Sequence, residues 1–88
     1  MVAAEQTLIV EIALPPKQSL RFQMLLEVEE GLAVTRCFDP EHKKQQLWTT
    51  PSQRDELLAW LSSLPEALEI QVMDEWLWRG ANGSRKIR

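Results

Sequence analysis

Alternation of apolar and polar residues predicts a first strand over residues 7–14. The even-numbered positions of this segment are all apolar and form one face. Ile9 and Ala13 place apolar side chains on the opposite face as well. Pro15 and Pro16 end the strand, because proline has no amide hydrogen to donate to a neighbouring strand. The segment therefore predicts a strand with apolar residues on both faces.

A repeat of apolar residues at helical spacing predicts a helix over residues 17–30. Gly31 stands where a helix commonly ends in the left-handed conformation, and Leu32 follows as its hydrophobic contact. The stripe expected to face the core is formed by Leu20, Met24, Leu25 and Val28, widened by Phe22 and Leu26.

Two further strands are predicted over residues 32–38 and 45–50, joined by a polar link that starts with Asp39 and Pro40. Asp-Pro is a common way to begin a turn. Two strands separated by a short polar link form a hairpin.

A second helix is predicted to begin with Thr50 as its N-cap, Pro51 in the first helical position and Gln53 as the capping-box partner. Pro65 ends it. A last strand is expected over residues 68–78. The buried stripe of this helix is expected to be formed by Leu57, Leu58, Leu61 and Leu64.

The predicted order is therefore strand, helix, strand, strand, helix, strand. For a chain of 88 residues this order favours an α+β fold, a ferredoxin-like βαββαβ sandwich. Its four-stranded antiparallel sheet would carry both helices on one face and leave the other face open. Residues 1–78 are expected to form this single domain, and residues 79–88 a disordered basic C-terminal tail.

The segment Leu26–Arg36, followed by Asp39 and Pro40, resembles a small bacterial family known as domain of unknown function 4911. The resemblance covers roughly residues 7–74 and departs after the Asp-Pro turn, where relatives often have a glycine and this chain has His42, Lys43 and Lys44. It implies the fold described above and implies no activity, so no catalytic residue can be carried over.

Charge is divided unevenly along the chain. Residues 1–78 contain six Lys or Arg against thirteen Asp or Glu, a net charge of −7, whereas residues 79–88 carry +4. An acidic body repels nucleic acid and anionic membranes, so we expect neither as a partner. Cys37 is the only cysteine, which indicates a reducing compartment. The start of the chain lacks a signal-peptide pattern, and we expect a cytoplasmic protein.

Few residues suggest chemistry, and each has a simpler explanation. His42 could serve a nucleophile as its base, but its position in a hairpin turn favours a solvated side chain. Cys37 could be activated by Arg36, but a packed structural cysteine is the commoner case. Lys17 and Arg21 could hold an anion at the start of the first helix, or simply be solvated. We expect no catalytic residues, no metal site and no cofactor.

Four tryptophans and no tyrosine make the aromatic content unusual. Trp60 lies beside the apolar stripe of the second helix, and the other three lie on predicted strands. Strand aromatics on an open sheet can stack on RNA bases, but the acidic body and the lack of an aromatic and basic RNA-binding pattern argue against this. Packing or an interface is the favoured explanation. The candidate interface residues are Ile9, Ala13, Trp48, Trp76 and Trp78.

Three functions follow from these observations. The favoured one is a non-enzymatic interaction or assembly module that forms a homodimer or docks on a protein partner, through the open sheet face or an edge strand. The second is a regulatory domain that binds a small ligand at a dimer interface. An enzyme is the least favoured, because no acid and base groups occur in a recognisable arrangement.

Overall fold

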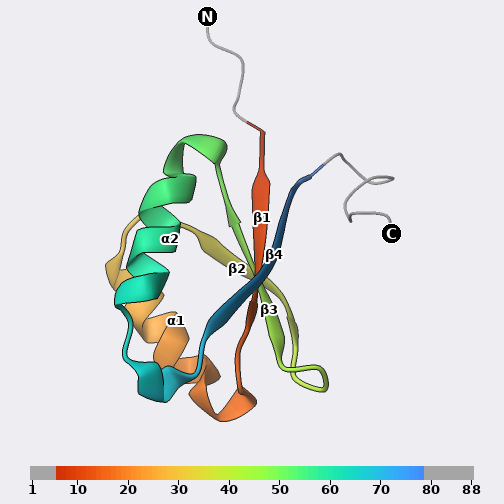
Figure 1. The fold of residues 1–88 in the computed structure, drawn as a ribbon, viewed down its shortest axis with the longest axis vertical. Coiled ribbons are helices and arrows are strands. Elements are labelled where there is room, and N and C mark those ends of the chain that lie inside the picture. The colour runs from red at the N-terminus through yellow and green to blue at the C-terminus, as the bar shows by residue number, and fades with distance from the viewer. Residues whose placement is uncertain (1–5, 79–88) are drawn as a thin grey trace, which may run out of the picture.

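The computed structural model describes residues 6–78, and it has the predicted βαββαβ order (Figure 1). The two helices lie on one side of a four-stranded sheet, whose strand order is β2-β3-β1-β4 with every neighbouring pair antiparallel. The fold is ferredoxin-like α+β. The elements are β1 (Leu8–Ala13), α1 (Ser19–Val28), β2 (Val34–Asp39), β3 (Lys44–Thr49), α2 (Arg54–Ser63) and β4 (Gln71–Leu77).

The core lies between the helices and the sheet. Strand β1 supplies its centre, because it has a neighbour on each side and Val10 and Ile12 are fully buried. Phe22 of α1 packs against Trp60 of α2 with ring centroids 5.8 Å apart, so this tryptophan belongs to the interior. The other buried members of the core are Leu8, Leu14, Leu26, Leu32, Leu47, Leu57 and Leu61.

The face of α1 that packs on the core is the margin of the predicted stripe and not its centre. Phe22 and Leu26 are buried, whereas Leu20, Met24 and Val28 are 70%, 60% and 77% exposed. At 3.6 residues per turn these two sets point in nearly opposite directions. The helix has two apolar faces, and the core takes the one with the larger aromatic side chain. The prediction was right to include Phe22 and Leu26, and it was wrong to centre the stripe on Leu20, Met24 and Val28.

The start of α2 is close to the prediction. Pro51–Gln53 form a 3-10 turn after Thr50, as proline in a first position favours. The Thr50 hydroxyl donates a hydrogen bond to Gln53 Oε1 at 3.2 Å. The predicted capping-box bond is replaced, because Gln53 Nε2 donates to the carbonyl of Gly31 at 2.9 Å. This bond joins the end of α1 to the start of α2.

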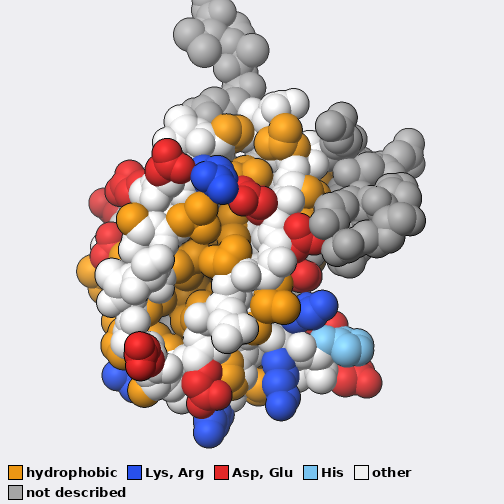
Figure 2. Space-filling view, in the orientation of Figure 1, with side chains coloured by type: hydrophobic (Ala, Val, Ile, Leu, Met, Phe, Trp, Pro, Cys, Tyr) orange, Lys and Arg blue, Asp and Glu red, His pale blue; other side chains and the backbone are white. Residues whose placement is uncertain are grey.

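The outer edge of the sheet is only partly covered by the helices. Val72 of β4 lies opposite Ile12 in the sheet and yet is 45% exposed. Figure 2 shows apolar side chains in the space between α2 and β4. Arg54 of α2 reaches across to Glu75 of β4, with its Nε 2.7 Å from Oε1 and its Nη2 2.8 Å from Oε2. This bidentate ion pair connects α2 to the edge strand β4.

Candidate functional site

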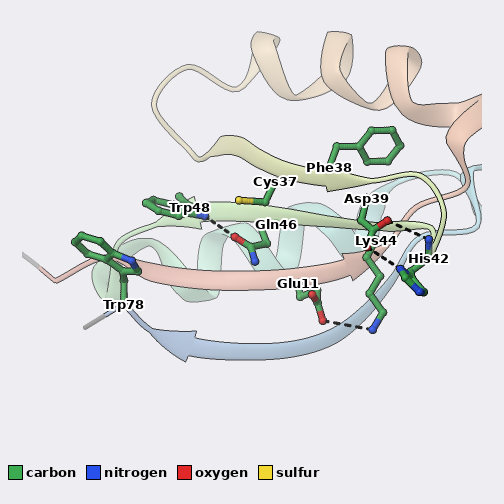
Figure 3. A pocket seen from close by; sticks show the side chains of 9 residues that line it. All are labelled: Glu11, Cys37, Phe38, Asp39, His42, Lys44, Gln46, Trp48 and Trp78. Atoms are coloured by element: carbon green, nitrogen blue, oxygen red, sulfur yellow. Dashed lines mark hydrogen bonds and ion pairs between the residues drawn. The ribbon is translucent and has the colours of Figure 1, made fainter. Parts of the chain in front are cut away.

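A groove of about 750 Å³ runs along the helix-free face of the sheet (Figure 3). Tryptophan rings stand at one of its ends and charged side chains at the other. Its walls come from β1, the β2–β3 hairpin and the residue after β4. The lining residues are Glu11, Cys37, Phe38, Asp39, His42, Lys44, Gln46, Trp48 and Trp78.

The register of the sheet places two kinds of side chain in adjacent rows on this face. The first row crosses all four strands and is apolar, and the second row is polar and charged. Residues directly opposite one another in neighbouring strands have side chains close enough to interact. The first row consists of Val34, Trp48, Ile9 and Trp76, and the second of Arg36, Gln46, Glu11 and Asp74.

The aromatic end of the groove is held together by the tryptophans themselves. The rings of Trp48 and Trp78 have centroids 5.8 Å apart and are tilted by 38°. Arg36 lies 5.5 Å from the centroid of Trp48, within cation–π range. Trp48 Nε1 donates to Gln46 Oε1 at 3.0 Å, which fixes the indole orientation. Ile9, in the same row, is only 1% exposed.

The other end of the groove is formed by the turn of the β2–β3 hairpin. His42 Nδ1 lies 2.8 Å from Asp39 Oδ2, and the His42 amide donates to Asp39 Oδ1 at 3.2 Å. These two hydrogen bonds lower the pKa of the Asp39 carboxyl below its usual value. Lys44 Nζ lies 4.0 Å from Glu11 Oε1, and the Glu11 side chain is only 14% exposed. Charges of both signs therefore border this end.

A bulge in β2 shapes the wall between the two ends. Cys37 and Phe38 lie opposite the single residue Gln45, and Cys37 adopts a φ of 55°. The carbonyl of Arg36 accepts a hydrogen bond from Gln45 Nε2 at 2.7 Å. The extra residue changes the alternation, so Val34 faces the groove side while Phe38 points toward the helices (Figure 3).

The bulge also overturns one prediction. Cys37 was expected to be packed, and instead it is exposed. A residue at a bulge leaves the regular pairing of the strand, so the neighbouring alternation does not determine its environment. Figure 3 shows the thiol directed toward Trp48, whereas the His42 imidazole lies at the opposite end of the groove. The two side chains therefore do not form a nucleophile and base pair in this structure.

The predicted interface residues do lie on the helix-free face of the sheet, but they differ in accessibility. Ile9 is buried, so in this structure it cannot contact a partner. Ala13 and Trp76 are partly exposed, and Trp78 is 37% exposed. Sequence reasoning missed the charged groove residues Glu11 and Asp39. The sequence placed Glu11 on one face of the first strand and Asp39 at the start of the polar link, and no spacing indicated that both line one groove.

The predicted anion contact lies outside the groove. Lys17 and Arg21 are exposed at the start of α1, where a 3-10 turn precedes the helix. Two amides at this position already donate within the turn: Gln18 to the carbonyl of Pro15 and Ser19 to that of Pro16. An anion would therefore find fewer free N–H groups than the start of a regular helix offers.

Within residues 6–78 no group of three or more His, Cys, Asp or Glu side chains could hold a metal ion. No helix in this part of the chain has the length and apolarity needed to cross a membrane. The predicted tail, residues 79–88, lies outside the described residues. Comparison with protein families, curated proteins and solved structures finds no match to the chain.

Proposed function

We propose that this chain is a non-enzymatic interaction module that docks a protein partner on the helix-free face of its sheet. The observation that carries the proposal is the groove, with the Trp48–Trp78 pair at one end and the Asp39–His42 pair at the other. Tryptophan and arginine are enriched at protein interfaces and dominate their binding energy. Trp78 and Arg36 are both exposed here.

The two ends of the groove suggest what a partner would present. An apolar side chain would pack on the tryptophan rings, and a polar or charged group would reach the Asp39–His42 hydrogen bonds and the Lys44–Glu11 ion pair. Such a pattern suits an extended polypeptide segment. The separation of Cys37 from His42 supports a binding role over nucleophilic catalysis.

The test is selection of a random linear peptide library displayed on phage, using the full chain as bait. Peptides enriched by the native chain should bind Trp78→Ala at least about tenfold more weakly, as expected for an interface tryptophan. Glu56→Ala, an exposed change on α2, is the matched control and should bind normally. In amide and indole NMR spectra, the bound peptide should shift the signals of Trp48 and Gln46.

Trp78 follows the last strand and is partly exposed, so its replacement is expected to leave the fold intact, which circular dichroism can check. The proposal is wrong if no peptide is enriched. It is equally wrong if enriched peptides bind Trp78→Ala as well as the native chain and shift signals away from the groove.

A second candidate function is the binding of a small regulatory ligand in the same groove. The volume of the groove favours this function, because about 750 Å³ lies within the ~300–1,000 Å³ of typical ligand pockets. A thermal-shift screen of a metabolite library distinguishes this function from protein docking. A ligand at 100 times its dissociation constant adds about 2.7 kcal/mol of stability, whereas a protein-docking groove should give no such response.

We also propose three broader properties of the chain. Membership of the family known as domain of unknown function 4911 is supported only by the residues that resemble it. A cytoplasmic location is supported by the single cysteine in the sequence. Self-association is also proposed, and the surface best suited to it is a different one from the groove.

A further inference from the structure

The outer face of α1 is an exposed apolar stripe. Leu20, Met24 and Val28 follow one another at intervals of four residues and are 70%, 60% and 77% exposed. They span about 12 Å along the helix. They account for three of the seven large apolar side chains that are exposed in the described part of the chain. A helix normally buries such a stripe against another element, and here α1 already has a separate face in the core.

The charges beside this stripe are divided between the two ends of the helix. Lys17 and Arg21 lie before Met24, and Glu27 and Glu30 follow it; all four are exposed. Within residues 6–78, none of the four takes part in an ion pair shorter than 4.0 Å. Each sign also lies at the end of the helix whose dipole opposes it. The distribution is unfavourable for an isolated helix and needs another explanation.

Packing against an antiparallel copy of the same helix would account for both the exposed apolar stripe and the divided charges. Met24 lies midway between Arg21 and Glu27, three residues from each. If two copies pack antiparallel with Met24 at the crossing point, the basic end of each helix meets the acidic end of the other. A parallel arrangement would place like charges together. The face is thus complementary to itself, as a two-fold symmetric interface requires.

We propose that the chain self-associates through the Leu20–Met24–Val28 face of α1, with two copies of the helix packed antiparallel around Met24. The occupant of this face is a second copy, because the charge pattern that flanks the stripe is its own complement. The groove lies on the opposite face of the sheet, so this inference neither requires the proposed function nor fails with it.

The size of the α1 face determines how tightly two copies are expected to bind. One helix of ten residues from each copy buries less than the ~800 Å² per partner found in stable complexes. We therefore expect a weak dimer, with a dissociation constant of roughly 10–500 µM. Sedimentation equilibrium of the full chain from about 10 µM to about 1 mM covers that range. A chain that remains monomeric throughout overturns the proposal.

Charge reversal tests the antiparallel arrangement directly. The variant Lys17→Glu with Arg21→Glu leaves only acidic charges beside the stripe, and Glu27→Lys with Glu30→Lys leaves only basic ones. Each variant alone should dimerise at least about tenfold more weakly than the native chain, because like charges then face each other. Mixed in equal amounts, the two should form a heterodimer at least as strong as the native homodimer.

The matched control for the basic variant is Glu56→Lys with Glu66→Lys, which makes the same change in net charge as Glu27→Lys with Glu30→Lys, at exposed positions away from α1. This control should dimerise like the native chain. If the control loses self-association as completely as Glu27→Lys with Glu30→Lys, net charge is responsible and the proposed face is wrong. Failure of the two reversed variants to associate with each other would overturn the antiparallel pairing.

Cross-linking gives an independent readout of the position of the two-fold axis. Helices that pack 8–10 Å apart bring facing backbones at the crossing point within reach of a disulfide. Met24→Cys, in a chain with Cys37→Ser, should therefore form disulfide-linked dimers under mild oxidation. Ala59→Cys in the same background places an exposed thiol on α2 and should not. Equal cross-linking of the two variants would overturn the inference.

Discussion

Ile9 provides the sharpest test of how the helix-free face is built. It lies on the side of the sheet without helices, yet it is 1% exposed, in a row between Trp48 and Trp76. Ile9→Ala removes three carbon atoms. At ~0.8 kcal/mol for each buried CH₂ group, the lost transfer free energy is about 2.4 kcal/mol. A residual cavity adds to this, within the ~2–5 kcal/mol range of such substitutions.

The surroundings of Ile9 place the expected loss at the lower end of that range. Its neighbours in the row are partly exposed indole rings, which can move inward and fill part of the cavity. We therefore expect Ile9→Ala to lower the free energy of unfolding by about 2.5–3 kcal/mol. For a domain of this size the melting temperature should fall by roughly 10–20 °C.

Urea unfolding followed by tryptophan fluorescence measures this difference, at a few micromolar protein so that self-association does not contribute. Leu20→Ala is the control, because it removes the same number of carbon atoms from a side chain that is 70% exposed. It should cost less than about 0.5 kcal/mol. If Ile9→Ala costs no more than Leu20→Ala, the tryptophans do not seal this face and our description of the site is wrong.

Three further predictions follow from single residues. Arg54 donates hydrogen bonds that lower the pKa of Glu75, so the pair's contribution to stability is present above the ordinary glutamate pKa of 4.5 and is lost as pH falls through the lower folded-state pKa. The difference in melting temperature between the native chain and Glu75→Gln should therefore shrink from pH 7 to pH 3. A difference that stays constant over this range would contradict the prediction. Gly31 has a φ of 77°, and no atom lies within 4 Å of an added Cβ, so Gly31→Ala should lose about 1 kcal/mol of stability through backbone strain alone. Urea unfolding measures this loss, and an unchanged urea midpoint would contradict the prediction. Exposed Cys37 should react with a thiol reagent in the folded chain at a rate within about tenfold of a free thiol, and strong protection would show that the bulge is packed in solution.

Much of the fold could be predicted because strand patterning is local. The alternation in β1 and the polar link after Asp39 identify strands and a hairpin without knowledge of the rest of the molecule. The order of the elements then leaves few compact arrangements, and the ferredoxin-like one is observed.

What could not be predicted depends on contacts between distant segments. Helix α1 has apolar residues on opposite sides, and periodicity gives no means of choosing Phe22 over Leu20. The bulge at Cys37 is a property of the register between β2 and β3, so one strand read alone looks regular through it. Cys37 of that bulge lines the groove. The sequence therefore located the face of the sheet and its tryptophans, while the charged end of the groove emerged only from the pairing.

The two proposed surfaces have a consequence when they are considered together. The stripe on α1 belongs to the helix layer, and the groove lies on the far side of the sheet (Figures 1 and 3). A dimer formed through α1 would leave both grooves uncovered. Two weak sites carried by one dimer can bind a repeated or dimeric partner far more tightly than either site alone, provided the partner can span them. Marginal self-association would then be useful, because a bivalent partner would favour the dimer at concentrations where the free chain is mostly monomeric.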